Sequence, residues 1–438
     1  MTESLPLLID AIRSGRLTPT DHVGQTLDRL AGDPFNTVIT LDANRAMAAA
    51  AVLTDEAAHG RWRGPLHGIA VGVKDLIDVA GLPSRCGSNV LRDAPPAVVD
   101  APVVALLRAA GAVIVAKLHT QEFAHGPTGD VAATGPARNP HDPTRITGGS
   151  SSGSAAAVAA GYLPLALGTD TGCSVRTPAA LCGVVGLKPT YGALSTDGVF
   201  PLAESLDHVG LLTGDVAGAA LAWTVLSGRD DGTPLSVDGL RVGVPVDDYW
   251  RPADPAIEPW PAAAVAALAA AGAQVVQVRT PMIEELVGAY PLIVGNEAYA
   301  THERWLTRRP ADYQPLIRQR LLSFAGRPAT EYIAAQRTRR RLVSEFRSAV
   351  GDVDVLVLPT TRLRATPIGV ASVPVGGVDV DVRPALLALN SPFNLTGWPA
   401  VSVPAPVDGL PIGVQIVGVR VDEHAVLDVA AALERAWR

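Results

Sequence analysis

The chain has 438 residues, of which 48% are hydrophobic and 18% are charged, and its formal net charge at pH 7 is −7. A charged fraction below the roughly 25% that is usual in globular proteins predicts a large buried core. The acidic balance argues against a nucleic-acid-binding surface, which needs clustered basic residues. No uninterrupted apolar run approaches the roughly 20 residues of a membrane span, so we expect no membrane association.

Location in the cell is predicted from the cysteines and from the N-terminal segment. The three cysteines, Cys86, Cys173 and Cys182, are odd in number and lie within apolar or Gly-rich stretches, unlike a secreted disulfide framework. The opening segment MTESLPLLIDAIRSGRL carries an acidic residue where a secretory signal would be basic. Both features favour a cytoplasmic protein.

The periodicity of apolar residues predicts alternating helices and strands along the whole chain. Helical patterns are followed by strand-like runs and further helices in the first part: helices at 5–12, from 18 onward, at 44–58, 103–110 and 154–160; strands at 69–73, 113–115 and 163–167; and a turn at 168–174. A second alternation follows: strands at 240–244, 274–278, 353–358, 400–403 and 412–417, with helices at 262–271, through most of 282–348 and at 422–436. This α/β alternation predicts one mixed sheet that is covered by helices.

Two Gly-rich segments carry the strongest chemical signal. GGSSSGSAAAVAAG occupies residues 148–161, and GTDTGCSVRTPA occupies 168–179. Ser150 and Ser174 lie in two turns that can fold back against each other across a short helix and strand. A serine becomes an effective nucleophile when a partner removes its proton, and the tetrahedral intermediate needs aimed N–H donors, which Gly-rich turns supply. The pattern therefore favours attack on a carbonyl carbon.

The same segment also permits a rival interpretation. Gly149–Gly153 matches G-x-S-x-G with Ser151 at its centre, which is the pattern of the nucleophile elbow in an α/β-hydrolase esterase. Such an elbow follows a strand, whereas the preceding NPHDPTRIT is polar and Pro-rich. We keep Ser151 as the alternative nucleophile.

Over most of its length the chain resembles the amidase signature family, serine hydrolases with a Ser–cisSer–Lys triad. The resemblance rests on these motifs: GPLHGIAVGVKDLIDVAG (64–81), GAVIVAKLHTQEFAHG (111–126), NPHDPTRITGGSSSGSAAA (139–157), GVVGLKPTYG (183–192), SLDHVG (205–210) and NLTGWPAVSVPAPVDGLPIGVQIVG (394–418). It implies an α/β/α sandwich around a large, mixed, twisted sheet. We expect a single domain over 1–438, with core motifs at about 64–226 and 390–438 and a variable substrate-loop region at about 240–385.

Carried over position by position, the resemblance assigns a catalytic triad. Ser174 matches the acyl-forming nucleophile, Ser150 the bridging serine after a cis peptide bond, and Lys74 the general base. Burial of Lys74 behind GIAVGV would lower its pKa and leave a neutral amine that accepts a proton. The backbone N–H groups of Thr171, Gly172, Cys173 and Ser174 match the oxyanion hole.

Two positions depart from the family pattern, and one loop is expected to bind substrate. The family usually has glycine at the positions of Ser152 and Cys173. A side chain at Cys173 is expected to crowd the acyl pocket or to strain a turn suited to glycine. We expect substrate contacts around His125 and within 280–390.

The other basic residues are assigned structural roles. Lys117 and Lys188 are competing bases that we expect to be structural, His208 is expected to anchor a loop, and Arg176 is expected to be a hydrogen-bonding hub. The cluster Arg337, Arg339, Arg340 and Arg341 is expected to form a solvated helix face. The nine histidines lack metal-ligand spacing, so no metal and no cofactor are expected.

The function expected on these grounds is an amidohydrolase that cleaves C–N bonds of linear amides through a Ser174 acyl-enzyme. Aryl amides and carbamates (urethanes) are candidate substrates, with a side activity on esters. The leading alternative is a glutaminase that works inside a tRNA-dependent amidotransferase complex. The expected partner is a small-molecule amide or carbamate, and the resemblance allows a homodimer, although no interface is readable.

Overall fold

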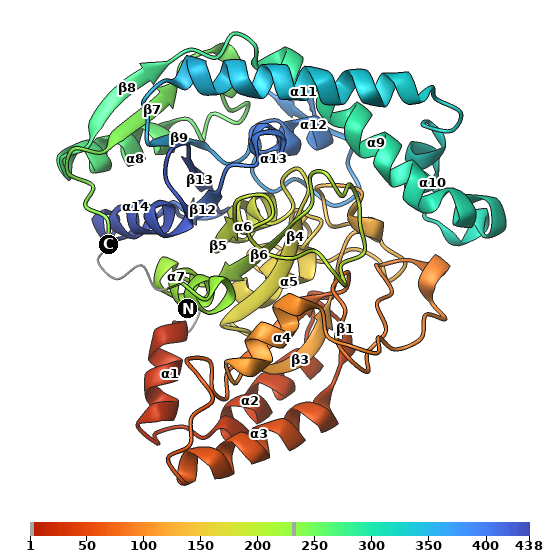
Figure 1. Cartoon of the computed structure of the whole chain (residues 1–438), viewed down its shortest axis with the longest axis vertical. Coiled ribbons are helices and arrows are strands. Elements are labelled where there is room, and N and C mark those ends of the chain that lie inside the picture. The colour runs from red at the N-terminus through yellow and green to blue at the C-terminus, as the bar shows by residue number, and fades with distance from the viewer. Residues whose placement is uncertain (1–3, 230–233) are drawn as a thin grey trace.

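The computed structural model describes residues 4–229 and 234–438, and one 11-stranded sheet runs through the molecule (Figure 1). The strand order is β1-β3-β2-β4-β6-β5-β12-β13-β9-β7-β8. The strands are β1 (Val38–Leu41), β2 (Ala70–Lys74), β3 (Val113–Leu118), β4 (Leu165–Asp170), β5 (Val185–Lys188), β6 (His208–Thr213), β7 (Arg241–Pro245), β8 (Gln274–Val278), β9 (Val355–Pro359), β12 (Ala400–Pro404) and β13 (Gly413–Gly418). The sheet is mixed: β2 pairs in parallel with β3 and β4, whereas β6, β5, β12 and β13 pair antiparallel in its centre.

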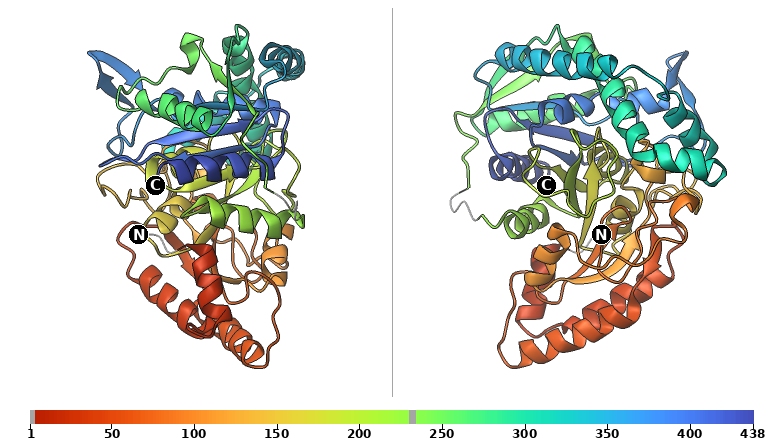
Figure 2. Two further views of the ribbon diagram at one scale, coloured as in Figure 1. Left: turned by 90° about the vertical axis from the view of Figure 1, so that its left-hand side faces the viewer. Right: turned by 45° about the vertical axis from the view of Figure 1, so that its right-hand side comes forward.

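Helices cover both faces of this sheet, so the fold is an α/β/α sandwich (Figure 2). One face packs against α1 (Leu5–Arg13), α4 (Pro102–Ala109), α7 (Val216–Ser227), α8 (Pro259–Ala270) and α14 (Glu423–Ala436). The other face packs against α2 (Pro19–Ala31), α3 (Ala43–Ala58), α5 (Ser152–Ala159) and α6 (Arg176–Cys182). The alternation of strand side chains produces the two layers: Val71 and Val73 of β2 belong to the first core, whereas Ala70 belongs to the second.

A helical region lies over the far part of the second face. It consists of α9 (Ile283–Arg308), α10 (Pro315–Leu322), α11 (Ala329–Val350), α12 (Val382–Leu387) and α13 (Ser391–Thr396), with the separate hairpin β10 (Ser372–Val375) and β11 (Val378–Asp381) before α12. The short 3₁₀ helices are η1 (Asn89–Leu91), η2 (Glu122–Ala124), η3 (Asp248–Trp250) and η4 (Pro310–Asp312). In Figure 1, α9 and α10 lie beside the first half of the chain, so residues distant in sequence can meet there.

The predicted alternation of helices and strands is largely confirmed, with two differences at the motifs. β4 continues to Asp170, so the predicted turn at 168–174 begins only at Thr171. His208, which we expected to anchor a loop, is the first residue of strand β6. The pairing of β6 with β4 explains both: Asp170 lies opposite His208 in the ladder, and this pairing extends each strand.

Within residues 4–229 and 234–438, none of the helices is both long enough and apolar enough to span a bilayer.

Candidate active site

Lys74 and the two segments that carry Ser150 and Ser174 lie together at the carboxyl-terminal ends of strands β2 and β4. Lys74 is the last residue of β2, Ser150 lies in the loop that leads into α5, and Ser174 lies in the turn that follows β4. Because β2 and β4 are parallel neighbours, their carboxyl ends open onto the same edge. Local strand pairing therefore brings Lys74 to the turn that holds Ser174.

Lys74 is fully buried and is surrounded by hydroxyl groups. Its Nζ lies 2.7 Å from Ser150 Oγ, 2.7 Å from Thr169 Oγ1 and 3.0 Å from Ser151 Oγ. Burial lowers the pKa of Lys74 to about 7, and the nearby carboxylates of Asp170 and Asp207 oppose that fall. A substantial fraction of this lysine is therefore neutral at neutral pH.

The Ser150 loop and the Ser174 turn are held side by side. The peptide bond between Gly149 and Ser150 is cis, as the resemblance implies, and Ser151 N donates to Ser174 O at 3.2 Å. Within the described ranges the structure forms no direct hydrogen bond between the Ser150 and Ser174 hydroxyls. Catalytic hydrogen bonds often close only when substrate is bound, so the absence of this bond does not conflict with a relay between the two serines.

The turn at 171–174 presents unpaired backbone donors. The next two N–H groups, of Val175 and Arg176, donate to the Asp170 carboxylate. In contrast, the N–H groups of residues 171–174 donate no hydrogen bond to any other described residue, although the turn is buried. Buried backbone N–H groups are almost always paired, so a run of unpaired ones beside a serine marks a place for a developing negative charge.

Asp170 and Arg176 fix the base of this turn. Arg176 is fully buried and makes a two-pronged ion pair with Asp170, with N···O distances of 3.0 and 2.9 Å. Its remaining N–H groups donate to Asn390 O, Gln415 Oε1 and Asn394 Oδ1. The ion pair holds the pKa of Asp170 far below its usual range despite burial. Arg176 is thus the hydrogen-bonding hub that we expected from the sequence.

Cys173 occupies its place in the turn without a left-handed backbone. The non-glycine residues with positive φ among those the structure describes are Asn36, Cys86, Phe123 and Ala124. The expected backbone strain at Cys173 is therefore wrong. Its thiol is buried in the catalytic cavity, and burial raises the pKa of Cys173 to about 12, so the thiol is neutral.

A small cavity opens in front of Ser174. It measures about 20 Å³, roughly one water position, and is lined by Ala124, His125, Gly126, Thr171, Cys173, Ser174, Leu202, Tyr290, Val294, Arg383 and Leu387. An outer cavity of about 830 Å³ shares Tyr290, Arg383 and Leu387 with it. The two cavities therefore adjoin each other at these three residues.

The structure places His125 in this cavity. The two preceding residues, Phe123 and Ala124, have φ values of 49° and 57°, an uncommon backbone for residues with a side chain. Burial, followed by the charges of Arg383 and Arg320, lowers the pKa of His125 to about 3. His125 is therefore a neutral imidazole in the cavity wall at neutral pH.

Tyr290 and Arg383 are site residues that the sequence motifs did not single out. Tyr290 belongs to α9 and lies over Gly172, where an added Cβ would collide with the tyrosine hydroxyl. Arg383 belongs to α12. Both come from the segment expected to hold substrate loops, and no local motif marks either one.

The competing basic residues are engaged away from the cavity. Lys117 pairs with Asp75 at 3.0 Å, and Lys188 donates to Pro189 O and Trp398 O. His208 Nδ1 lies 2.6 Å from Leu206 O. The expectation of a solvated arginine face is wrong for Arg339, which is half-buried and donates to Leu395 O and Ser205 O.

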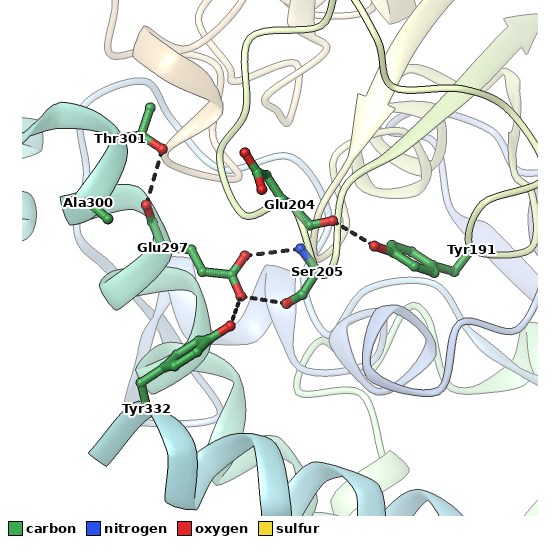
Figure 3. A pocket seen from close by; sticks show the side chains of 7 residues that line it. All are labelled: Tyr191, Glu204, Ser205, Glu297, Ala300, Thr301 and Tyr332. Carbon is green, nitrogen blue, oxygen red and sulfur yellow. Dashed lines mark hydrogen bonds between the residues drawn. The ribbon is translucent and has the colours of Figure 1, made fainter. Parts of the chain in front are cut away.

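A third cavity, of about 420 Å³, shares no lining residue with the cavity that Ser174 lines, and hydrogen bonds join several of its own lining residues (Figure 3). In Figure 3 the Glu297 carboxylate points toward Ser205 and Tyr332. It accepts from Ser205 N, Ser205 Oγ, Tyr332 Oη and Gln336 Nε2. This network fixes the 202–207 loop, in which Leu202 lines the catalytic cavity.

The same loop also holds the start of the oxyanion turn. Asp207 accepts from Leu202 N, Ala203 N and the Thr171 hydroxyl. Burial raises the pKa of Asp207 to about 7. Asp207 therefore ties the cavity wall to Thr171.

No group of three or more His, Cys, Asp or Glu side chains suited to a metal ion occurs among residues 4–229 and 234–438.

Comparison with known proteins shows the family of the chain. The Amidase family model matches residues 21–427, so the chain belongs to the amidase signature family. It is 37% identical, over 98% of its length and 97% of the relative's, to AtzE of Pseudomonas sp., a component of 1-carboxybiuret hydrolase. It is 39% identical, over 89% of its length and 100% of the relative's, to one of the subunits of the glutamyl-tRNA(Gln) amidotransferase of Halobacterium salinarum.

A solved structure described as an amidase has the same fold. It aligns with a TM-score of 0.93 and 36% identity over 100% of both chains. Membership in this family and the α/β/α fold thus agree with the resemblance read from the motifs.

Proposed function

We propose that this protein is an amidohydrolase in which Ser174 attacks the carbonyl carbon of a small-molecule amide and is activated by Ser150 and Lys74. The observation that carries the proposal is the run of unpaired N–H donors at 171–174 beside a serine whose neighbouring loop contacts a buried lysine with a pKa of about 7. Donors, nucleophile and base are the three parts that acyl transfer needs.

The hydrogen bonds around Lys74 give a direction to proton movement. The Ser151 hydroxyl proton is directed to Thr169 O at 3.1 Å, so Ser151 Oγ accepts from Lys74. A neutral lysine has two N–H donors and one lone pair. If Ser151 and Thr169 Oγ1 take the two N–H groups, the lone pair faces Ser150 Oγ.

The reaction then proceeds through an acyl-enzyme. Ser174 Oγ bonds to the carbonyl carbon while its proton passes to Ser150, whose own proton passes to Lys74. The N–H groups of 171–174 stabilise the oxyanion, the C–N bond breaks, and the amine leaves with the relayed proton. Water then attacks the ester and its proton passes through Ser150 to Lys74. As the carboxylic acid leaves, the proton returns by the same route to Ser174 Oγ, which restores the hydroxyl and the neutral lysine.

Labelling with a fluorophosphonate tests the nucleophile, and Ser151 provides a matched control. We expect the adduct on Ser174 of the wild type and none on Ser174→Ala, which should lose amide hydrolysis by at least about 10⁴-fold. Ser151→Ala should keep the label and part of the activity, because Ser151 orients Lys74 through its bonds to Lys74 and Thr169 but does not lie on the proposed proton route. An adduct on Ser151 located by mass spectrometry would overturn the assignment.

The second candidate function is glutaminase activity within an amidotransferase, which the 39% identity to a component of the glutamyl-tRNA(Gln) amidotransferase favours. The same serine would then release ammonia from glutamine. Ammonia release from glutamine by the isolated protein, compared with release from simple aliphatic amides, anilides and carbamates, separates the two. A preference for glutamine of more than about tenfold would favour the amidotransferase function.

A further inference from the structure

Arg383 is the charged side chain in the wall of the catalytic cavity. The other lining residues in the described part of the chain are apolar or uncharged, since His125 is neutral and Cys173 is a thiol at neutral pH. Arg383 also lines the outer cavity, so it lies at the junction between the two spaces.

Arg383 has no partner for its charge in residues 4–229 and 234–438. It takes part in no hydrogen bond and no ion pair with them, and its Nε is buried and unpaired. Arg383 is half-buried overall, and its Nε, which is shielded from water, lacks a compensating hydrogen bond, which costs free energy. By contrast, the fully buried Lys74 and Arg176 have partners: Lys74 has three hydroxyls and Arg176 has a carboxylate.

The surroundings of Arg383 do not neutralise it. The acidic residues of the outer cavity, Asp248, Glu284 and Asp381, are exposed and lie beyond ion-pair distance. Arg362, which also lines the outer cavity, donates to Tyr249 O and stacks on the Tyr249 ring, so it adds a second positive charge to the wall of this cavity. The charge of Arg383 contributes, after burial, to the low pKa of His125 and of Arg320.

We propose that Arg383 binds a carboxylate of the substrate, so that the enzyme acts on small amides or carbamates that carry a carboxylate close to the scissile bond. The proposal rests on the proposed function of Ser174. A carboxylate matches the planar fork of the guanidinium, and the resulting pair is a strong charge-assisted interaction. With the carboxylate on Arg383 at the mouth of the cavity, the carbonyl of a short substrate lies against Ser174 and the 171–174 donors.

Matched substrates test this binding. Succinamate carries a carboxylate, and butanamide is its uncharged counterpart. We expect the wild type to favour succinamate by more than about tenfold in kcat/KM. Arg383→Met should lose about 30-fold or more on succinamate, mainly through KM, and less than about threefold on butanamide. Arg383→Lys should recover part of the loss because it restores the charge without the fork.

Arg251→Met is the control variant, because Arg251 is an exposed arginine outside the catalytic cavity. It should leave both substrates unchanged. A second measurement does not depend on turnover: succinate should slow fluorophosphonate labelling of Ser174 in the wild type, and should do so at least about tenfold less effectively in Arg383→Met.

The outcomes separate the two proposals. If Ser174 is labelled normally but the wild type hydrolyses both amides equally, the carboxylate proposal is wrong and the nucleophile stands. Equal losses on both amides in Arg383→Met would show a structural role for the arginine and would also overturn the proposal. If Ser174→Ala keeps its activity, the proposed function itself fails.

Discussion

The acidic limb of the pH–rate profile should report the buried Lys74. In the proposed mechanism the neutral amine of Lys74 is the active form, and the pKa of Lys74 is about 7. Protonation below this pH removes the base, so kcat/KM should fall tenfold for each pH unit. About half of the enzyme is active at pH 7 and about one tenth at pH 6, and activity at pH 5 should be roughly 100-fold below the plateau above pH 8.

The assay is kcat/KM from pH 5 to 9 on one amide and on one aryl ester of the same acid. Lys74→Ala should lose far more activity on the amide than on the ester, because an amine leaving group needs the relayed proton and a phenolate does not. The residual ester hydrolysis of this variant should show no limb near pH 7. Equal losses on the two substrates would contradict the proton relay.

A second group titrates in the same range and must be separated from Lys74. Asp207 has its pKa raised to about 7 by burial, and its ionised form would also appear as pH rises. Asp207→Asn cannot titrate, yet it keeps a side-chain oxygen toward Thr171. The limb near pH 7 should persist in this variant, at a lower overall rate. Its disappearance would assign the limb to Asp207 and would refute the reasoning about Lys74.

Two further variants test the turn and the loop beside it. Cys173→Gly should stay within about tenfold of the wild type in kcat/KM, or about 1.4 kcal/mol in the barrier, because glycine supplies the same N–H. A loss of kcat/KM by several orders of magnitude with an unchanged Tm would show that the thiol takes part in the reaction. Glu297→Ala should lower the free energy of unfolding by about 1–3 kcal/mol, with a lower Tm, because four donors lose their acceptor. Glu303→Ala, at an exposed position, should change neither quantity. Equal effects of the two substitutions would contradict a specific role for the network.

The part of the site built by neighbouring strands was predictable from the sequence. The apolar run before Lys74 indicated a buried strand, and Lys74 is indeed the last residue of β2. The polar, Pro-rich segment before the Gly/Ser run made a strand there, and hence an elbow at Ser151, unlikely, and the described chain has no strand within 143–151. Short-range patterns were sufficient here because the site forms where two parallel strands end.

The remaining part depended on contacts that local patterns do not encode. Tyr290 lies in a long helix with a weak apolar stripe, and it reaches Gly172 only because α9 packs over the sheet edge. Arg339 looked like one of several surface arginines, yet it caps carbonyls of two other segments. Tertiary packing decides the role of such residues, since their sequence neighbours resemble those of any exposed helix.

The residues that local sequence patterns predicted and the residues that tertiary packing brings to the site have different roles in the proposed mechanism. Lys74, the segment Ser150–Ser151 and the turn at 171–174 are tied together by buried hydrogen bonds, so a change there disturbs several partners at once. Tyr290 and Arg383 approach from α9 and α12, and Arg383 is bound to nothing else in the described ranges. We therefore expect a substitution at Arg383 to alter which substrates reach Ser174 without loosening these hydrogen bonds, so that substrate preference changes at this position while the proposed chemistry stays the same.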